Sequence, residues 1–438
     1  MKALLIGLAV TNQAVARGLL RRGHDVVACD DAPAASVRSA ARDMGIELLE
    51  APAVEDLRRL VRGADAVFPS PGVPARHRVF ALARELGVPV RSEFDLAAEW
   101  DARPVVAITG TDGKTTVTTL VAAMLEASGR RAAAVGNTET PLVAAIDDPA
   151  TDVFVVEASS FRLEHSGRFA PRVGTWLNFA PDHLEAHASL ADYERAKARI
   201  WRDQGAGDLA VANADDPVVM KWVPAAGPDV VTFGLTAGDY RSKGATLFAL
   251  GEPVVEAGEL WRALPHDIAN ALAATATALG GGASMAGCRD ALRSFRGLPH
   301  RVTLVGEHGE VRWYDDSKAT TPHATLAAVR GFPSVVLIAG GRNKGLALSA
   351  LAAEVARIRA VVAIGEAAAD IERAFTGVRP VTEAGSMADA VARAAEFAEP
   401  GDAVLLSPAC ASFDWYSSYA ERGDDFARLV HQWLGVPR

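Results

Sequence analysis

Residues 105–129 read VVAITGTDGKTTVTTLVAAMLEASG, and this stretch decides how the chain folds. The apolar run VVAI predicts a buried strand, and the run after Lys114 predicts a helix that Gly129 closes. Glycines between them let backbone N–H groups approach phosphate oxygens, and the helix N-terminus adds positive potential. Lys114 is expected to reach the terminal phosphates of a nucleotide, and the Thr115 hydroxyl to hold Mg²⁺. The predicted ATP-binding loop consists of Gly110, Thr111, Asp112, Gly113, Lys114, Thr115 and Thr116.

The strand–loop–helix context carries this prediction, because the longer G-x4-G-K-[ST] pattern is not met. Its first glycine would fall at Ile108. A GTPase would also carry an N-K-x-D motif that reads guanine. The nearest candidate starts at Asn343 and has Leu346 in place of the aspartate, which counts against a regulatory GTPase.

Two further stretches resemble strand–loop–helix openings. They are ALLIGLAVTN near residue 7 and SVVLIAGGRNKG near residue 340. Each could begin a doubly wound sheet of its own, with ligands at the carboxyl ends of its strands. Polar segments at 92–104 and 295–301 separate the three openings. We therefore predict an α/β protein with three domains, at 1–93, 94–297 and 298–438.

Composition excludes several classes of protein. Of 438 residues, 50% are hydrophobic and 23% charged, and the formal charge is −9 with no basic block, so a large nucleic-acid-binding face is not expected. The three cysteines lie far apart without CxxC spacing, which argues against a disulfide framework or structural zinc. The short N-terminal apolar run is broken by Gly7, which favours a strand over a signal peptide. We expect a cytoplasmic monomer without a membrane span.

Two potential metal ligands follow neighbouring predicted strands. Glu157 ends the strand TDVFVVE, and His183 follows VGTWLNFA. Both should therefore lie near the carboxyl edge of the sheet that carries the phosphate loop. A carboxylate, an imidazole and the Thr115 hydroxyl could share two Mg²⁺ ions beside ATP. Taken alone, Glu157 would be a surface charge and His183 a helix cap.

Eight motifs occur in one order between residue 110 and about 425. They are TGTDGKTT, EASSFRLE, NFAPDHLEAH, YERAKARIW, HDIAN, GLPHR, DDSKAT and LLSPACAS. Each motif alone is a weak signal, but together they resemble the Mur ligase family over nearly the whole chain. The resemblance implies a Rossmann-like N-terminal domain for a UDP-linked substrate, a central P-loop ATPase-like domain, and a Rossmann-like C-terminal domain for glutamate and ATP.

The resemblance also implies a reaction. ATP would activate UDP-N-acetylmuramoyl-L-alanine as an acyl phosphate, and D-glutamate would be added to it in peptidoglycan synthesis. Alternatives are a similar ligase that adds L-glutamate, a folylpolyglutamate synthase-like ligase, and a family member that adds another amino acid. A non-catalytic sensor of ATP and UDP-sugar is a fourth, which the set of Lys114, Glu157, His183 and Lys197 disfavours.

The family resemblance gives Lys197 a role that the residue alone does not suggest. Lys197 lies between Arg195 and Arg199, so its ordinary interpretation is a lysine on a solvated helix face. Tyr193, Ala196 and Lys197 match Y-x-x-A-K, whose lysine is carbamylated in similar ligases and bridges to Mg²⁺. The implied catalytic residues are Lys114, His183 and Lys197, and the implied metal ligands are Thr115, Glu157, His183 and Lys197.

The resemblance implies nucleotide contacts at the two ends of the segment HDIAN and in segments that follow it. His266 and Asn270 match residues that face adenine, although Asp267 stands where the family has Asn. Arg301 and Asp316 would hold ATP, and Lys318 would approach the product.

The first domain is expected to bind the UDP-linked substrate. It lacks two of the three glycines of G-x-G-x-x-G, which disfavours a dinucleotide-dependent oxidoreductase, but Gly7 still permits a tight turn that cradles a diphosphate. The implied substrate-binding residues are Thr11, Asp30, Ser70, Pro71, Gly72, Asn137 and Ser159. The chain departs from the family at Val135, where Gly is usual, and at Arg162, where Gln is common.

For glutamate, the resemblance implies Lys318, Thr320, Lys344, Ser412 and Tyr419. A lysine that pairs with one carboxylate and hydroxyls that bind the other suit a dicarboxylic amino acid. Ser412 could also cap a helix. Cys410 is expected to be a small packing residue rather than a nucleophile.

Overall fold

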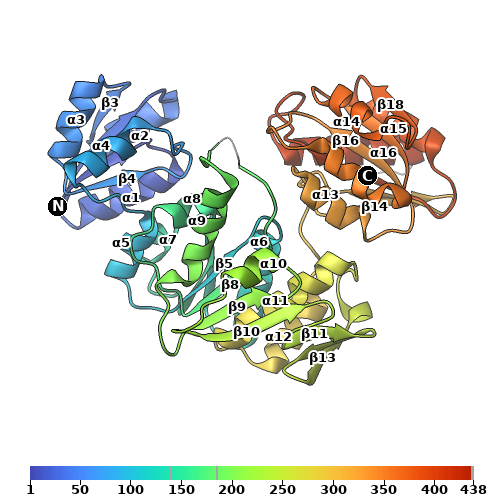
Figure 1. Cartoon of the computed structure of the whole chain (residues 1–438), viewed down its shortest axis with the longest axis horizontal. Coiled ribbons are helices and arrows are strands. Elements are labelled where there is room, and N and C mark those ends of the chain that lie inside the picture. The colour runs from blue at the N-terminus through green and yellow to red at the C-terminus, as the bar shows by residue number, and fades with distance from the viewer. Residues whose placement is uncertain (139, 184–185, 436–438) are drawn as a thin grey trace. The chain divides into compact units, whose positions relative to one another are not determined.

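The computed structural model describes residues 1–138, 140–183 and 186–435 and contains three sheets, each covered by helices (Figure 1). The chain divides into two compact units. The first unit comprises Met1–Phe179, His183–Glu256 and Asn270–Ser294, and the second comprises Ala180–Asp182, Ala257–Ala269 and Phe295–Arg438. The first unit holds two of the sheets, so the domain boundaries at 93/94 and 297/298 stay a prediction.

The first sheet is parallel, with the strand order β3-β2-β1-β4. Its strands are β1 (Lys2–Ile6), β2 (Asp25–Asp30), β3 (Glu47–Glu50) and β4 (Ala66–Pro69), and its helices are α1 (Val10–Arg21), α2 (Ala35–Met44), α3 (Val54–Arg62) and α4 (Arg78–Leu86). Successive strand side chains point to opposite faces. Leu5 therefore packs in one apolar cluster with α1, and Leu4 in another with α3 and α4. The strand–loop–helix opening predicted near residue 7 is confirmed.

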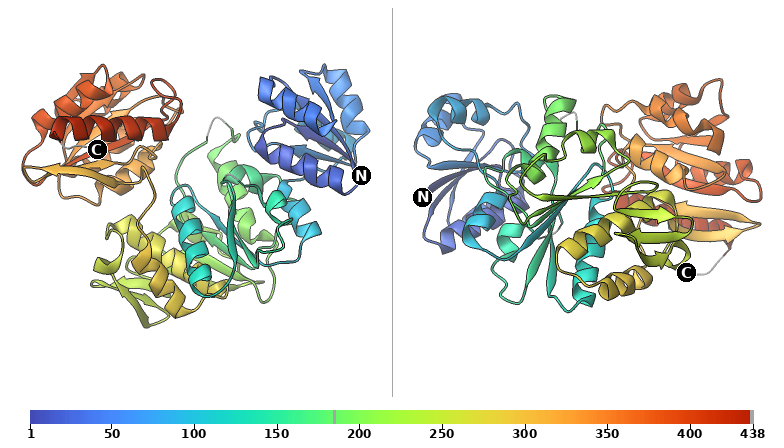
Figure 2. Two further views of the ribbon diagram at one scale, coloured as in Figure 1. Left: turned by 180° about the vertical axis from the view of Figure 1, so that it is seen from behind. Right: turned by 60° about the horizontal axis from the view of Figure 1, so that its bottom comes forward.

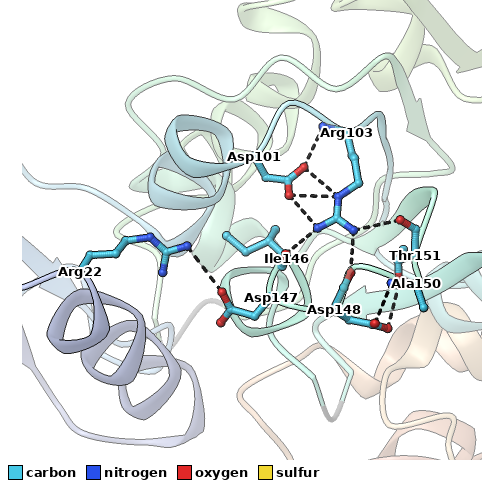
Figure 3. A network of polar contacts seen from close by, with 8 residues as sticks. All are labelled: Arg22, Asp101, Arg103, Ile146, Asp147, Asp148, Ala150 and Thr151. Atoms are coloured by element: carbon cyan, nitrogen blue, oxygen red, sulfur yellow. Dashed lines mark hydrogen bonds and ion pairs between the residues drawn. The ribbon is translucent and has the colours of Figure 1, made fainter.

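A short segment leads from the first sheet to the second. Helix α5 (Glu93–Trp100) begins with a capping box between Ser92 and Asp95. In Figure 3 the Arg103 guanidinium binds the Asp101 carboxylate and also donates to the carbonyl oxygens of Ile146, Asp148 and Thr151. Arg22, the C-cap residue of α1, reaches Asp147 in the same view, at 3.5 Å. These contacts fix the segment after α5 against the loop before β7.

The second sheet has nine strands in the order β13-β12-β11-β10-β9-β8-β5-β7-β6. The strands are β5 (Val105–Thr109), β6 (Ala132–Gly136), β7 (Val153–Glu157), β8 (Val173–Trp176), β9 (Leu209–Asn213), β10 (Asp229–Gly234), β11 (Tyr240–Lys243), β12 (Thr246–Ala249) and β13 (Glu252–Glu256). Pairing is parallel from β6 to β11 and antiparallel beyond. Strand β5 lies between β7 and β8, so the loop that follows it has polar loops on both sides.

Helices cover both faces of the second sheet (Figure 2). They are α6 (Lys114–Ala127), α7 (Leu142–Ala145), α8 (Ser160–Glu164), α9 (Leu190–Arg202), α10 (Pro217–Lys221), α11 (Pro265–Gly280) and α12 (Met285–Ser294). The 3-10 turn η1 (Ala257–Glu259) belongs to the second unit. Trp176 packs with Ile200 and Trp201 of α9 on one face. Its neighbour Thr175 points to the other face and bonds Thr277 of α11 at 2.7 Å.

The third sheet has the order β14-β15-β19-β16-β17-β18. Its strands are β14 (Thr303–His308), β15 (Val311–Asp315), β16 (Val335–Gly340), β17 (Ile358–Ile364), β18 (Val381–Ala384) and β19 (Ala403–Ala409). The helices are α13 (Pro322–Val329), α14 (Ala368–Phe375), α15 (Met387–Phe397) and α16 (Tyr419–Leu434), with the 3-10 segment η2 (Leu348–Arg357). Val336 and Leu337 belong to different apolar clusters, as two covered faces require.

The opening predicted near residue 340 is wrong in two respects. Strands β14 and β15 precede β16, and β16 leads to a loop and a 3-10 segment, not an α-helix. A Cβ on Gly340 would lie 2.0 Å from the Ile364 carbonyl oxygen, and one on Gly341 would lie 2.4 Å from that of Ala411. Backbone from two neighbouring segments thus packs against the glycines, and their φ values of +130° and +123° lie outside the α-helical region.

Among the described residues, no helix combines the length and apolar character needed to cross a membrane.

Candidate active site

The predicted phosphate loop lies between β5 and α6, in a backbone conformation that requires its glycines. Gly113 has φ +85°, and a Cβ there would lie 2.6 Å from the Asn270 side-chain oxygen. Asn178 fixes the other side of the loop, because its Oδ1 accepts from the backbone N–H of Thr111 at 3.0 Å and of Asp112 at 2.9 Å. No side chain caps α6, so its first N–H groups are available to an anion.

Two lysines meet at this loop. Lys114 Nζ donates to the carbonyl oxygens of Gly110 at 3.0 Å and of Thr111 at 2.8 Å. Lys197 Nζ, from α9, donates to the same Gly110 oxygen at 2.6 Å. Lys197 is 1% exposed, and its Nζ lies 4.6 Å from the centroid of the Tyr193 ring. The ordinary interpretation of Lys197 as part of a solvated helix face is therefore wrong.

Glu157 ends β7 beside the phosphate-loop strand, since its register partner on β5 is Ile108. The side chain is buried at 3% exposure, so Glu157 is not a surface charge. Its Oε1 accepts from Asn137 Nδ2 at 3.1 Å, whereas the buried Oε2 has no hydrogen-bond partner among the described residues. A buried carboxylate oxygen without a partner is costly unless a cation or water binds it. This orphaned oxygen fits a metal ligand.

His183 lies in an aromatic cluster beside α8 and α9. Its ring is 4.8 Å from Phe161 and 6.1 Å from Tyr193 between centroids, and its backbone φ is +55°. Sequence reasoning missed His187, whose buried ring stacks on Phe161 at 5.3 Å. His187 Nε2 bonds the Ser160 hydroxyl at 2.9 Å, and its Nδ1 lies 3.2 Å from a Glu164 oxygen. His187 thus holds Phe161, against which His183 packs.

A pocket of ≈ 450 Å³ lies at the carboxyl edge of the first sheet. Its lining brings together five residues that the sequence assigned to the UDP-linked substrate: Thr11, Asp30, Ser70, Pro71 and Gly72. Arg162, the departure from the family pattern, lines it too. The other two assigned residues, Asn137 and Ser159, follow β6 and β7 of the second sheet, and the Ser159 hydroxyl is buried without a hydrogen-bond partner among the described residues.

The predicted glutamate-binding residues lie in the second unit, around the carboxyl ends of β15, β16 and β19. Lys344 Nζ donates to the Thr320 hydroxyl at 3.3 Å and lies 3.8 Å from an Asp182 carboxylate oxygen. Lys318 Nζ lies over the Tyr419 ring, 3.7 Å from its centroid. Ser412 is buried at 2% exposure.

Ser412 is not a helix cap. Helix α16 begins at Tyr419 with Ser418 as its N-cap, and the Ser412 carbonyl instead accepts from Trp415 and Tyr416 in a turn. Cys410 is fully buried, and burial raises the pKa of its thiol to about 12, as a packing residue requires. Sequence reasoning missed Arg422, which is 1% exposed and donates to Ser317 and to the Cys410 carbonyl. Burial lowers the pKa of Arg422 to about 10.

Asp316 and His300 have shifted pKa values for different reasons. Burial raises the pKa of Asp316 to about 7, although a hydrogen bond from Ser407 at 2.7 Å opposes the shift. The pKa of His300 is raised because its Nδ1 bonds the Asp315 carboxylate at 2.6 Å. Arg301, beside His300, lowers the pKa of Asp316 through its charge.

The HDIAN segment begins α11 and is divided between the two units. In the second unit, Asp267 accepts two hydrogen bonds from Arg262, at 2.6 and 2.8 Å, and His266 Nδ1 lies 3.2 Å from the Ala327 carbonyl oxygen. Asp267 thus forms an ion pair where the family has an amide. Asn270 belongs to the first unit and lies against Gly113 of the phosphate loop.

A larger pocket, ≈ 660 Å³, contains none of the predicted site residues. It lies near the amino ends of β5 and β7, and ion pairs at its rim join Arg103 to Asp101 and Arg91 to Glu99. The part of the chain that the structure describes has no group of three or more His, Cys, Asp or Glu side chains placed to hold a metal. The predicted metal ligands contain only two such residues, Glu157 and His183.

Sequence reasoning missed the residues that hold the site residues in place. Asn178 could have been suspected, because an amide that follows an apolar strand often marks a loop contact. Glu93 and Arg422 gave no local signal. Glu93 accepts a hydrogen bond from Arg162, which lies 69 positions away, and Arg422 donates to Ser317, which lies 105 positions away.

Comparisons with known proteins cover almost the whole chain. The Mur ligase middle domain matches residues 108–278, and the Mur ligase, glutamate ligase domain matches residues 300–410. UDP-N-acetylmuramoylalanine–D-glutamate ligase of Desulfosudis oleivorans is 42% identical over 445 residues, which cover 98% of this chain and 96% of the relative. The protein of the same name from Rubrobacter xylanophilus is 40% identical, with 98% of each chain covered.

Solved structures of related ligases share the fold. UDP-N-acetylmuramate-alanine ligase MurC from Thermotoga maritima has a TM-score of 0.57 and 21% identity, with 99% of each chain covered. A pseudomurein peptide ligase type C from Methanothermus fervidus has a TM-score of 0.60 and 19% identity over 92% of this chain and 96% of its own. At these identities the similarity shows the fold alone.

Proposed function

This chain belongs to the Mur ligase family, and from that premise we propose that it adds D-glutamate to UDP-N-acetylmuramoyl-L-alanine in an ATP-dependent reaction of peptidoglycan synthesis. Relatives that carry the name of this ligase match the full chain at about 40% identity. In the structure, the observation that carries the proposal is the convergence of Lys114 and Lys197 on the phosphate loop, next to the strand that Glu157 ends.

The proposed chemistry has two steps. The alanine carboxylate attacks the γ-phosphorus of ATP, and the bond from that phosphorus to the β-phosphate oxygen breaks. ADP departs, and the alanine carboxylate is now an acyl phosphate. The glutamate amine then attacks the acyl carbon, phosphate leaves with the bonding electrons, and the amine loses a proton as the amide forms. Catalysis by the chain consists mainly of positioning and charge stabilisation, as in other phosphoryl transfers.

Lys114 and the N–H groups at the start of α6 meet the terminal phosphates in this proposal. Lys114 reaches over its own loop in the structure, so a nucleotide phosphate would replace two carbonyl acceptors with a charged one. A hydrogen bond between charged groups is roughly twice as strong as a neutral one. We assign Asn270, Arg301 and Asp316 to ATP, with Asn270 placed by its contact with the phosphate loop.

The orphaned Glu157 oxygen and the Thr115 hydroxyl would hold Mg²⁺, together with His183 and a modified Lys197. Bound Mg²⁺ supplies Lewis-acid stabilisation of the phosphate charge. We propose two ions, with Glu157 and His183 on different sides of the loop. Asn137 orients the Glu157 carboxylate through its hydrogen bond to Oε1.

Carbamylation of Lys197 is part of the proposal. Two ammonium groups that share one carbonyl repel each other in a buried place. A carbamate on Lys197 Nζ would convert one of the two charges to negative, so that Lys197 and Lys114 attract each other. The Y-x-x-A-K match and the burial of Lys197 support this modification.

For glutamate, we propose that Lys344 pairs with one carboxylate, and that Thr320 and Ser412 bind by their hydroxyl groups. Lys344 already donates to Thr320, so the two groups are prearranged. Lys318 and Tyr419 form the neighbouring wall through their cation–π contact. The UDP-linked substrate is assigned to the pocket of Thr11, Asp30, Ser70, Pro71 and Gly72. Asn137 and Ser159, which follow β6 and β7 and do not line that pocket, are assigned to the same substrate.

One assay tests the proposal. Phosphate release from ATP is measured with UDP-N-acetylmuramoyl-L-alanine and D-glutamate together, and with each omitted. We expect release only in the complete mixture. Equal release without the nucleotide substrate would contradict the proposal. Release driven by a folate substrate would favour the folylpolyglutamate synthase-like alternative.

A further inference from the structure

The Asp316 carboxylate is held against an inner strand of the third sheet. Asp316 directly follows β15, and its backbone N–H donates to the carbonyl oxygen of Leu406 at 2.8 Å. Its side chain is bound by the next residue of β19, because Ser407 Oγ donates to Asp316 Oδ2 at 2.7 Å. Two consecutive residues of one strand therefore hold the backbone and the side chain of Asp316.

The Ser407 hydroxyl has little freedom to bind elsewhere. Ser407 is 0% exposed and lies on β19, between β15 and β16. A hydroxyl has one proton to donate. Ser407 Oγ also lies 3.1 Å from Thr325 Oγ1, but its contact with the carboxylate is shorter, and a charged acceptor makes the stronger hydrogen bond. Thr325 donates its own proton to the Ser407 carbonyl oxygen at 3.1 Å, so the Ser407 proton is left for Asp316.

The second carboxylate oxygen of Asp316 is left for a ligand. Asp316 is 6% exposed, and among the described residues none donates a hydrogen bond to its Oδ1. A largely buried carboxylate oxygen without a donor is costly unless a ligand or water meets it. Within ATP, the hydroxyl and amino groups of the nucleoside can donate to a carboxylate, whereas ionised phosphate oxygens cannot.

The charge of Asp316 is sensitive to single contacts near neutral pH. Burial raises the pKa of Asp316 to about 7, and the negative charge of Asp315 adds to the rise. The hydrogen bond from Ser407 opposes the rise most strongly, followed by the charges of Arg301 and Arg262. A hydrogen bond to the ionised form lowers the pKa of a carboxyl group. Without the Ser407 hydroxyl, the Asp316 carboxyl would be mostly protonated near neutral pH, and it would lose part of its capacity to accept.

We propose that Ser407 is a positioning residue for nucleotide binding, one that holds the Asp316 carboxylate in the orientation and charge state that bind ATP. The identity of the nucleotide rests on the proposed function. Ser407 touches no ligand itself, because it is fully buried and bonded to Oδ2. Its proton fixes that oxygen, which leaves Oδ1 for the ligand and favours the ionised form.

The test is the pH dependence of ATP binding to the whole protein, measured by calorimetry without the other substrates. Binding should strengthen as pH rises through the pKa of Asp316, since the ionised carboxylate accepts hydrogen bonds from the ligand. Ser407→Ala removes a contact that lowers this pKa, so the inflection should move to higher pH by roughly 1 pH unit. At pH of about 7, ATP should bind roughly 3- to 10-fold more weakly. The titration of ATP itself is common to all variants and cancels in the comparison.

Proton release provides a readout that a loss of packing would not move. At pH of about 8, wild type should release few protons from Asp316 on ATP binding, because the carboxyl is already ionised. Ser407→Ala should release several-fold more, since more of its Asp316 is protonated before ATP binds. Calorimetry in buffers of different ionisation enthalpy measures the number of released protons for both proteins.

Two controls separate positioning from a general effect on the third sheet. Thr325→Val also deletes a fully buried hydroxyl but leaves the hydrogen bond between Ser407 and Asp316, so the inflection should stay at the wild-type pH. In an Asp316→Asn background, Ser407→Ala should cause no further shift, because the two residues act through one hydrogen bond. An equal shift in Thr325→Val, or a shift that persists in the Asp316→Asn background, would overturn the proposal.

The outcomes distinguish a failed role of Ser407 from a failed ligase assignment. An active ligase in which Ser407→Ala keeps the wild-type inflection and proton release contradicts the role of Ser407 alone. Protein that shows the shifted inflection but releases no phosphate contradicts the ligase and leaves the role of Ser407 standing. Protein that does not bind ATP contradicts both. Thermal unfolding of each variant checks that the compared proteins are folded.

Discussion

Lys114 and Lys197 donate hydrogen bonds to one backbone oxygen, that of Gly110, at 3.0 and 2.6 Å. The two residues are 83 positions apart in the chain (197 − 114), on α6 and α9. Their convergence places two cations around a single peptide group of the phosphate loop. A bound phosphate would satisfy one of them, and a carbamate would reverse the charge of the other.

Lys114→Ala is expected to lower turnover at least about 100-fold, because one preorganised charge on the transferring phosphate is lost. Thermal stability should change little, since Lys114 is only half-buried. The matched control is Lys221→Ala, a surface lysine paired with Glu194, which should retain activity. Near-normal phosphate release by folded Lys114→Ala would contradict the role of the loop.

Lys197→Ala should also be nearly inactive, and added acetate should restore part of the activity by replacing the missing carboxylate. Lys114→Ala is the control, because a carboxylate cannot replace its positive charge. The measurement is phosphate release against acetate concentration for both variants. The carbamate proposal fails if no short carboxylic acid rescues Lys197→Ala, or if acetate rescues both variants alike.

Glu157→Gln tests the orphaned oxygen by two independent readouts. The Mg²⁺ concentration for half-maximal activity should rise roughly 10-fold or more, since an ionised ligand is lost. Without Mg²⁺ the thermal midpoint should stay equal or rise, because a buried charge without a full set of partners is removed. Glu126→Gln, on the exposed side of α6, should change neither quantity. A large loss of stability without Mg²⁺ would show a structural role instead.

Lys344→Ala should raise the KM for glutamate roughly 10- to 100-fold, because a carboxylate loses its cation. Arg342→Ala, in the same loop but paired with Glu366 at the surface, is the control.

D-glutamate should be strongly preferred, since only one enantiomer directs its amine at the acyl phosphate once both carboxylates are held. Faster turnover with L-glutamate at equal concentration would reverse the stereochemical assignment and leave the ligase chemistry intact.

The His300–Asp315 contact predicts a pH-dependent contribution to stability. The folded-state pKa of His300 is raised by the Asp315 hydrogen bond and further by Asp424, while Lys318 opposes the shift. A raised histidine pKa contributes stability that is fully present below the unfolded value of about 6.5 and is lost as pH rises through the folded value. The stability difference between wild type and His300→Asn should therefore be largest below pH of about 6.5 and shrink above it. Asparagine suits the site because it tolerates the positive φ of 59°. A difference that grows with pH would contradict this account.

Much of the fold was predictable because its signals are local. Strand β5, Gly113 and helix α6 follow one another within 25 residues (105–129), and each residue type favours the conformation it adopts. The alternation of strands and helices likewise indicated parallel sheets. The segment after β16 was predicted wrongly, because two glycines there serve close backbone packing with β17 and Ala411 rather than a helix start.

The sequence by itself determined the phosphate loop, the order of the motifs and the family, since these depend on neighbouring residues and on their spacing. Only the tertiary structure decided that Lys197 is buried on the Gly110 carbonyl, that one Glu157 oxygen lacks a partner, and that Arg162 reaches Thr11 across 151 positions. A charged side chain on a helix has the same local propensity whether it faces solvent or the interior. Packing between distant segments determines which of these environments it occupies, and with it the chemistry that the charge can perform.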